Sequence, residues 1–404
     1  MPARRGLALS ALGLGSLIAA LLGPVAASPA SGSVVHVAVS QGSWIGVGPM
    51  PHPAESQTMV RLHDGRGLAF ASWTSSDAPN CLRTADLFDP TTDTWSTAAP
   101  MHRSRCGASA VVLHSGRVLV AGGAVWPTRV HGPSYRRSAE IYDPGTNRWS
   151  FTGRMHQRRT GGAMAVLPHG RVLIAGGFHR GGSLAEAEIY DPRGGRWKVT
   201  GSLRASRDVS TKSTATLPNG DILVAGGQFE IWNPHWHGYY LSSAERYVVA
   251  SHRWRPAGDV SGRDNPILFQ LPNQQILAIA TKGRHVDRYQ PATRTWQEIA
   301  SLPRAMKVKH LSVEGVASVN GMPMVLAGRI TCHVSRNLGI GYLWRPRLHR
   351  WIRWTMMPRP LDGAAVLNLQ DGSTLVAGGV SRYYGCIGGD HIPTRYAYRY
   401  HPNL

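Results

Sequence analysis

The stretch "SAEIYDPGTNRWS" at residues 138–150 decides the fold, because a closely similar stretch recurs later in the chain. Each of the two stretches follows a similar Gly-rich segment. "GRVLVAGG" at 116–123 precedes the first copy, and "GRVLIAGG" at 170–177 precedes the second, "EAEIYDPRGGRWK" at 186–198. Both copies alternate short apolar runs with Gly- and Pro-containing turns, which is typical of β-strands. A unit that recurs in this way predicts a repeat architecture.

An aromatic residue followed seven positions later by Trp marks the same unit elsewhere. Six repeat units are complete by this criterion, with pairs at Phe88/Trp95, Tyr142/Trp149, Tyr190/Trp197, Tyr247/Trp254, Tyr289/Trp296 and Trp344/Trp351. Successive Trp residues of these pairs are 42 to 57 positions apart. Their average spacing is near the roughly 50-residue period of one class of propeller.

A hairpin signature lies upstream of each aromatic residue. The seven stretches are "LHDGRGLAF", "LHSGRVLVAGG", "LPHGRVLIAGG", "LPNGDILVAGG", "LPNQQILAIA", "VNGMPMVLAG" and "LQDGSTLVAGG". Dipeptides such as Asp-Gly and Asn-Gly supply the positive φ angles of tight β-turns. Each unit therefore has four short strands, a sheet too small to be stable unless neighbours cover both faces. The sequence predicts an all-β, seven-bladed β-propeller.

The seventh unit reaches its aromatic strand, "RYAYRY" at 395–400, and ends at Leu404 without a Trp. Trp44, in "SWIGVGPM" at 43–50, is followed by Pro49-Met50 at the positions where Pro100-Met101 follow Trp95. We therefore expect the strand of Trp44 to complete the last blade. A ring closed in this way leaves no strand edge open.

The Gly-Gly, Tyr-Asp-Pro and Trp pattern resembles the kelch-repeat family, and the resemblance covers about residues 42–404. It implies a kelch-type propeller, a fold that hosts binding modules, adaptors and some enzymes. Function must therefore be argued from the site.

A more distant resemblance is to the secreted galactose oxidase and glyoxal oxidase propellers, which are copper radical enzymes. That group needs a Cys cross-linked to a Tyr of the next blade, and a Tyr-His pair late in the propeller. Cys106 lies in a suitable loop, but the Tyr position falls at Gly161 and the Tyr-His position at Asp362-Gly363. We expect no cofactor and a non-catalytic protein. A sugar- or alcohol-directed enzyme on the same face is the alternative.

Residues 1–27 have the features of an export signal, with Arg4 and Arg5, an apolar run at 7–22 and small residues ending at Ala27. We expect a linker at 28–41 and the propeller at 42–404. No later stretch approaches the roughly 20 apolar residues that span a bilayer. The predicted location is secreted or extracytoplasmic.

The chain is strongly basic, with a net charge of +21 that becomes +19 once residues 1–27 are removed. Such a charge attracts polyanions. For an exported monomer we expect an acidic glycan, a cell-surface polymer or a protein as the partner, and no nucleic acid. The alternative is that the Arg excess reflects the base composition of the genome.

Four Cys in an exported chain suggest two disulfides. Loops between the second and third strands of a blade emerge on the same face as loops between blades. Cys81 and Cys106 lie in two such loops of the first and second blades, and Cys332 and Cys386 in two of the sixth and seventh. We predict Cys81–Cys106 and Cys332–Cys386 bonds.

The loops between blades also carry cations, which predicts a basic rim. The candidate ligand-binding residues are Arg105, Arg159, Arg207, Arg263, Lys307 and Arg359. Guanidinium groups bind carboxylate, sulfate or phosphate through paired charged hydrogen bonds. The alternative for each Arg is a packing role, with hydrogen bonds to backbone carbonyls.

The longest insertion, "FEIWNPHWHGYYLSS" at 229–243, adds Trp236, Tyr239 and Tyr240 as candidate sugar contacts. Aromatic faces stack on the apolar side of sugar rings. The alternative is a loop folded over the blade with its aromatic side chains buried. His235 and His237 have the spacing of metal ligands, but no further ligands can be assigned, so we predict no metal site.

Overall fold

Four-stranded antiparallel sheets make up almost all of the computed structural model, which describes residues 42–71, 73, 81–126, 132–232, 235–281, 283–304, 312–329, 338–359, 361–383 and 391–402. The predicted signal peptide (1–27) and linker (28–41) lie outside these residues. Three short 3₁₀ turns, η1 (Pro168–Gly170), η2 (Thr211–Ser213) and η5 (Pro346–Leu348), interrupt the strands. No helix in the described part of the chain is long and apolar enough to cross a membrane. The predicted all-β class is confirmed.

Seven of the sheets follow one pattern, in which each strand pairs with the next strand of the same unit. We number them in chain order. Sheet 1 is β2 (Thr58–Arg61), β3 (Gly67–Phe70), β4 (Ala85–Asp89) and β5 (Thr94–Ala98); sheet 2 is β6 (Ser109–Val112), β7 (Val118–Ala121), β10 (Ala139–Asp143) and β11 (Arg148–Thr152); sheet 3 is β12 (Ala163–Val166), β13 (Val172–Ala175), β16 (Ala187–Asp191) and β17 (Arg196–Val199); sheet 4 is β18 (Thr214–Thr216), β19 (Ile222–Ala225), β22 (Ser243–Val248) and β23 (Arg253–Asp259).

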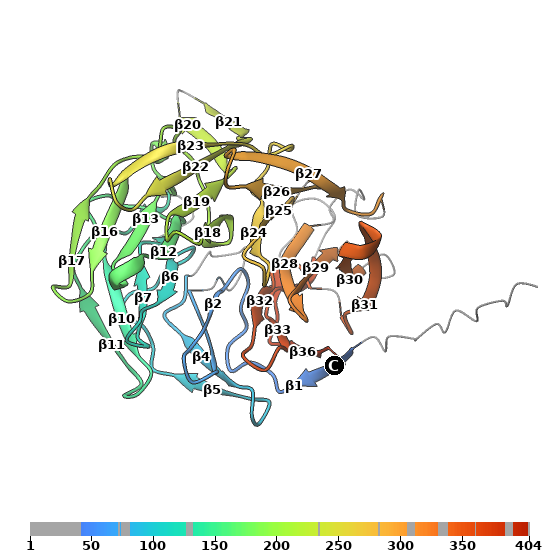
Figure 1. Cartoon of the computed structure of the whole chain (residues 1–404). Helices are drawn as coiled ribbons and strands as arrows, with labels where there is room; N and C mark the ends of the chain where they lie inside the picture. The colour runs from blue at the N-terminus through green and yellow to red at the C-terminus, as the bar shows by residue number, and fades with distance from the viewer. Residues whose placement is uncertain are drawn as a thin grey trace, which may run out of the picture. The chain divides into compact units, whose positions relative to one another are not determined.

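The remaining sheets continue the series. Sheet 5 is β24 (Ile267–Gln270), β25 (Ile276–Ile279), β26 (His285–Gln290) and β27 (Thr295–Ser301); sheet 6 is β28 (Ser312–Val319), β29 (Met322–Arg329), β30 (Leu338–Arg345) and β31 (Arg350–Met356); sheet 7 is β32 (Ala365–Asn368), β33 (Thr374–Ala377), β36 (Ala397–His401) and the N-terminal β1 (Ser43–Val47). In Figure 1 the first strands of successive sheets lie toward the middle, and the fourth strands at the periphery.

Smaller hairpins extend from the loops between the second and third strands. They are β8 (Ala124–Val125) with β9 (Ser134–Tyr135), β14 (Phe178–His179) with β15 (Gly182–Ser183), β20 (Gln228–Trp232) with β21 (Trp236–Tyr240), and β34 (Val380–Tyr383) with β35 (His391–Pro393). β15 also pairs with β20, so the hairpins of sheets 3 and 4 merge into one additional four-stranded sheet.

The aromatic–Trp spacing has a direct structural cause. Seven positions correspond to a third strand, a tight turn and a fourth strand, so the two rings face each other across the pair: Tyr142 lies opposite Trp149, and Tyr190 opposite Trp197. Their ring centroids are 5.0 Å apart in both pairs. Cross-strand aromatic pairs of this kind stabilise a sheet.

Trp44 supplies the same contact for the last sheet. It lies directly opposite Tyr400, with ring centroids 5.2 Å apart. Its Nε1 donates to Thr355 Oγ1 of sheet 6 at 2.8 Å, as Trp149 Nε1 donates to Ala99 O of the sheet before it at 2.7 Å. Trp197 and Trp296 donate to Gly153 O and Ala257 O in the same way, so in these four sheets the Trp joins its outer strand to the preceding sheet.

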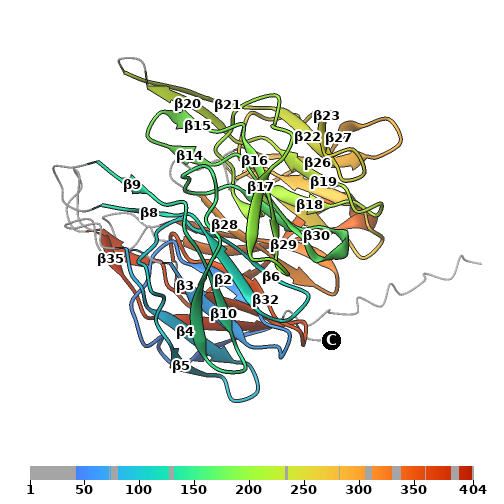
Figure 2. The same cartoon turned by 90° about the vertical axis from the view of Figure 1, so that its left-hand side faces the viewer.

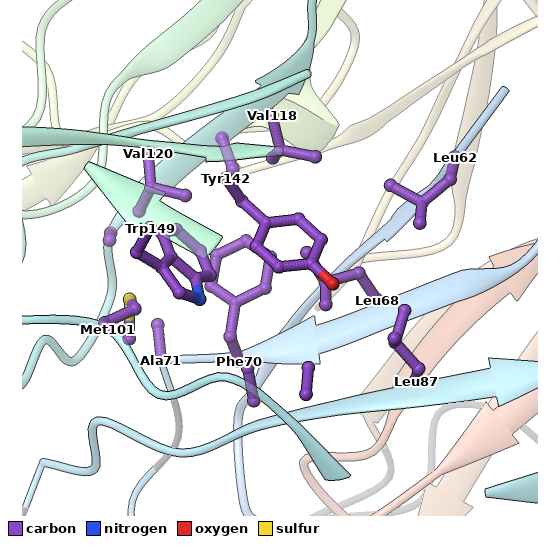
Figure 3. Close-up of a cluster of buried hydrophobic side chains, with 14 residues drawn as sticks. Leu62, Leu68, Phe70, Ala71, Leu87, Met101, Val118, Val120, Tyr142 and Trp149 are labelled. Atoms are coloured by element: carbon purple, nitrogen blue, oxygen red, sulfur yellow. The ribbon is translucent and has the colours of Figure 1, made fainter. Parts of the chain in front are cut away.

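The first strands of neighbouring sheets also contact each other. β2 contacts β6, β6 contacts β12, and the series continues through β18, β24, β28 and β32, which contacts β2. Apolar side chains fill the space between successive sheets. Figure 3 shows the cluster between sheets 1 and 2, where Leu68, Phe70, Val118, Tyr142 and Trp149 pack together.

The Gly-Gly pairs at the ends of the second strands are needed for close approach. Gly122 has a φ of +72°, and a Cβ there would lie 2.5 Å from Arg159 O. A residue with a side chain would therefore push sheet 3 away from sheet 2. This is the role expected of glycine where two backbones meet.

Candidate ligand-binding face

The hairpin extensions and the loops between sheets share one face, which we call the loop face. Isolated bridges join each entering loop to the hairpin of its own sheet: Cys106 pairs with Ala124, Thr160 with Phe178, and Asp208 with Gln228. In Figure 2 β9, β14, β20 and β35 all extend toward the left. Those sequence-predicted ligand-binding residues that the structure describes lie in the entering loops and in the insertion at 229–243, which belong to this face.

The prediction of a basic rim is wrong for Arg105, Arg159 and Arg207, because all three side chains are fully buried. Each makes an ion pair within its own sheet, to Glu140, Glu188 and Glu245 at 2.9, 3.2 and 2.7 Å. Each also donates to a carbonyl of a Gly-Gly pair, as Arg159 Nη1 does to Gly176 O at 2.6 Å. Burial lowers the pKa of all three guanidinium groups. They hold the entering loops in place and do not face a ligand.

The partner glutamates bind the loop backbone as well. Glu188 accepts the N–H groups of His156 and Gln157 at 2.7 and 2.9 Å, and Glu140 and Glu245 make the same pair of contacts one sheet before and one sheet after. Buried carboxylates require such partners. The alternative packing role for these arginines therefore describes what the structure shows.

The other predicted rim cations have different surroundings. Arg263 and Arg359 are exposed. Arg359 Nη1 donates to Tyr396 Oη at 3.1 Å, and its guanidinium lies 4.6 Å from the centre of that ring. Lys307 lies outside the described residues. Within the described chain, no hydrogen bond or ring contact links Arg263 to Arg359.

A groove between sheets 2 and 3 gathers five cations on the loop face. It has a volume of about 370 Å³ and is lined by Arg103, Arg136, Arg137, Arg154 and Arg158, together with Ser134, Tyr135, Ser138, Phe151 and Thr152. We call it the arginine groove. None of its lining residues is acidic. Among the described residues, the side chains of Arg137 and Arg154 form no ion pair or hydrogen bond.

Two of the groove arginines are held in position. Arg136 Nε donates to Ser104 O at 2.8 Å, and Arg158 Nη1 donates to Tyr135 O at 3.1 Å. Burial lowers the pKa of Arg136, and the nearby charges of Arg105 and Arg103 lower it further. Cations crowded in this way favour an anion between them. The adjacent Arg136 and Arg137, just before the third strand of sheet 2, were the sequence signal for this groove. They were not among the residues predicted from the sequence.

The aromatic insertion forms the β20–β21 hairpin. Tyr239 is 53% exposed and stacks against Phe229 of the facing strand, with ring centroids 5.1 Å apart. Trp232 is 53% exposed, whereas Tyr240 is half-buried. The side chain of Trp236 lies outside the described part of the structure. The exposure predicted for the aromatic side chains of the insertion therefore holds for Tyr239. Trp232, on the same hairpin, is a second exposed aromatic side chain.

Two carboxylates near the arginine groove and the β20–β21 hairpin were not predicted from the sequence. Asp208 is half-buried in the entering loop of sheet 4, and Glu230 lies two residues beyond its bridge partner on β20. Burial, and then the charge of Glu230, raise the pKa of Asp208 to about 7. The same carboxylates, after burial, help raise the pKa of Tyr135 to about 12. The loop face is thus basic over sheets 2 and 3 and acidic beside it.

Cys81 and Cys106 form a disulfide between the loops of sheets 1 and 2, as predicted. The proposed partners Cys332 and Cys386 lie outside the described residues. The loops beside the disulfide are further joined by Trp73 and Trp126, whose ring centroids are 4.6 Å apart.

The residues present do not fit a copper radical site of the galactose oxidase type. The sulfur of Cys106 is bound to Cys81, so it has no valence for a cross-link to Tyr. Gly161 has a φ of +64°, and a Cβ there would lie 3.0 Å from both Asp208 Oδ1 and Val209 O. No tyrosine side chain can occupy that position without displacing Asp208. No group of three or more metal-ligating side chains converges elsewhere in the described residues.

Comparison with known proteins gives a match to the kelch motif model at residues 159–204. Among curated proteins, the chain is 34% identical over 112 residues to a kelch repeat-containing protein, kel-10, of Caenorhabditis elegans, covering 26% of this chain and 18% of that protein. It is 28% identical over 232 residues to Kelch-like protein 25 of Rattus norvegicus, covering 54% of this chain and 37% of that protein. The resemblance to kelch-repeat proteins is confirmed.

The matched segments span 18% and 37% of the length of these two curated relatives. Among solved structures, the chain is similar to a fungal alcohol oxidase of the AA5 family in complex with copper. The TM-score is 0.64 with 15% identity, over 90% of this chain and 77% of that chain. At this identity the likeness concerns the fold alone.

Proposed function

We propose that this kelch-repeat chain is a non-catalytic binding module whose arginine groove holds an acidic glycan. The observation that carries the proposal is the groove itself: five arginines from neighbouring sheets line one cavity with no acidic side chain among them. Fork-shaped guanidinium groups match the planar carboxylate of a uronic acid and the oxygens of a sulfate ester.

The neutral residues of the groove favour a sugar over a simple anion. Ser134, Ser138 and Thr152 provide hydroxyl groups that both donate and accept hydrogen bonds, as sugar hydroxyls do. Phe151 is 54% exposed at the rim, where an aromatic face can stack on a sugar ring. Tyr135 of the groove contacts Phe178 at a centroid distance of 5.9 Å, and Phe178 belongs to the same sheet as the β20–β21 hairpin. An extended glycan could therefore continue from the groove toward Tyr239.

The scaffold of this proposal is a seven-bladed ring, closed by β1. The series of contacts between first strands, which returns from β32 to β2, supports it, as does the pairing of β1 with β36. We also propose that residues 1–27 direct export and are removed, and that the mature chain is a secreted or extracytoplasmic monomer. The Cys81–Cys106 bond suits an oxidising compartment.

Binding of a hexamer of galacturonic acid, measured by isothermal titration calorimetry, tests the function. Arg137→Ala with Arg154→Ala should weaken binding at least tenfold, because both side chains lack partners in the described chain and are available to the ligand. The matched control is Arg253→Ala with Arg255→Ala, which removes the same charge from exposed positions on β23. Equal loss in both variants would show attraction by net charge and would contradict a site in the groove.

A second candidate function is acid–base chemistry on the bound glycan. The favouring observation is the pKa of Asp208, which is raised to about 7 beside Glu230 and Tyr135. A carboxyl group with this pKa can give or take a proton near neutral pH. Release of shorter sugars from polygalacturonate, abolished by Asp208→Asn, would favour this candidate. Absence of turnover by the wild-type chain would leave binding as the function.

A further inference from the structure

The opposite end of sheets 2 and 3 carries a second group of cations. Strands alternate in direction, so the turns between first and second strands, and between third and fourth strands, lie at the end of each sheet away from the hairpin extensions. A cavity of about 700 Å³ is lined there by Arg117, Arg171 and Arg193, by His114 and His169, and by a single carboxylate, Asp191. We call it the turn pocket.

The corresponding turn of sheet 1 neutralises its arginine, because Asp64 pairs with Arg66 at 2.7 Å. The turn aspartates of sheets 4 and 7 pair with arginines on third strands, Asp221 with Arg246 at 3.3 Å and Asp371 with Arg399. At the position of Asp64, sheets 2 and 3 carry Ser115 and His169 instead.

As a result, no ion pair among the described residues joins the turn-pocket arginines to an acidic side chain. Within the described chain, Arg117 Nε reaches Ser115 Oγ at 3.4 Å, and Arg171 makes no side-chain hydrogen bond or ion pair. Asp191 Oδ1 accepts the backbone N–H of Arg193 at 2.9 Å, and its single negative charge is fewer than the three arginines of the pocket.

The two turns are held side by side. A Cβ at Gly170 would lie 3.3 Å from Nδ1 of His114, so the imidazole of one turn packs on the backbone of the next. This contact brings Arg117 and Arg171 to one cavity, with His114 and His169 exposed beside them. The side chains offered to a ligand are mostly hydrogen-bond donors, in contrast to the hydroxyl-rich arginine groove.

We infer that the turn pocket binds a phosphate- or sulfate-type oxyanion carried on a larger molecule. An acceptor-only tetrahedral group can take up donors from several guanidinium groups at once, whereas a sugar hydroxyl would leave most of them unpaired. The site lies on the other end of the sheets from the arginine groove and does not depend on the function proposed there.

The test measures binding of inorganic tripolyphosphate by calorimetry, in a full-length chain that already carries Arg137→Ala and Arg154→Ala so that the groove contributes little. Adding Arg117→Ala and Arg171→Ala should weaken binding at least tenfold. The matched control is Arg66→Ala, which removes a cation of the corresponding turn that Asp64 already pairs. It should change binding less than twofold.

Absence of saturable binding, or a loss in the Arg117/Arg171 variant no larger than in the Arg66 control, would overturn the inference. If the alanine variant does not fold by circular dichroism, Arg117→Lys with Arg171→Lys replaces it. Lysine keeps the charge but loses the forked geometry, so the same comparison should show a several-fold loss. Repeating the titration with a sulfated disaccharide shows which oxyanion is preferred: tighter binding of either ligand through Arg117 and Arg171 supports the site.

Discussion

Arg158 and Arg159 are adjacent in the sequence and have opposite environments. Arg158 is exposed in the arginine groove, whereas Arg159 is buried against Glu188. The sequence predicted Arg159 to lie on the basic rim, because its partner Glu188 lies 29 residues away on another strand. A sequence signal did exist: Glu140, Glu188 and Glu245 each stand two residues before the aromatic residue of a repeat.

Arg159→Ala should therefore lower stability without touching the ligand site. Removing one partner of a buried ion pair leaves the other charge uncompensated and costs about 3 to 5 kcal/mol. Urea unfolding of the variant would measure this loss, with Arg137→Ala as the exposed control that should cost less than about 0.5 kcal/mol. Equal stability of the two variants would contradict the structural role of Arg159.

Asp208 predicts a pH dependence of stability. Its folded pKa of about 7 is raised above the usual value of an aspartate, so the folded state holds the proton more tightly than the unfolded chain. The resulting stabilisation is fully present below about pH 4 and is lost as the pH rises through about 7. Burial is the main cause of the raised pKa of Asp208, and the charge of Glu230 adds to it.

Replacing Asp208 with Asn removes this ionisation. At pH 8 the variant should have a higher melting temperature than the wild-type chain. The difference in the free energy of unfolding between the two should shrink between pH 7 and pH 4, by up to about 4 kcal/mol in total. Melting curves at several pH values measure it. A difference that stays constant with pH would show that Asp208 titrates normally.

At the scale of elements, the order of strands was predictable and the hairpin extensions were not. A seven-residue aromatic–Trp spacing fits only a strand, a tight turn and a strand, so local geometry determined the pairing of Tyr142 with Trp149. The merging of β15 with β20 depends on two insertions, from sheets 3 and 4, meeting in space. Neither insertion contains a signal for the other, so this part of the loop face needed the structure.

The Cys81–Cys106 bond joins two elements of neighbouring sheets, with 25 positions between the cysteines. Replacing both with Ser should lower the free energy of unfolding by about 2 to 4 kcal/mol, chiefly because the unfolded chain is less restricted. Denaturant curves with and without a reductant check this. If the reductant leaves the midpoint of the wild-type chain unchanged, the bond contributes nothing to the stability of the fold.

In the whole molecule, the first and last described strands pair with each other. Trp44 stacks on Tyr400 and donates to Thr355 of sheet 6, as Trp149 stacks on Tyr142 of sheet 2 and donates to Ala99 of sheet 1. Trp44→Ala should therefore lower the melting temperature by as much as Trp149→Ala, and each change should reduce the free energy of unfolding by about 2 to 4 kcal/mol. Ile45→Ala, at an exposed position of the same strand, is the control and should have little effect. A Trp44 variant as stable as this control would contradict closure by β1.

Hydrogen exchange of the intact chain, with and without saturating galacturonic acid hexamer, is the decisive measurement, because it locates the ligand on the molecule. Binding in the arginine groove should slow exchange at residues 134–138 and 151–158 and leave exchange unchanged at the turn 63–66 and at 253–255 of β23. Protection absent from the groove, or spread evenly over exposed arginines, would contradict it.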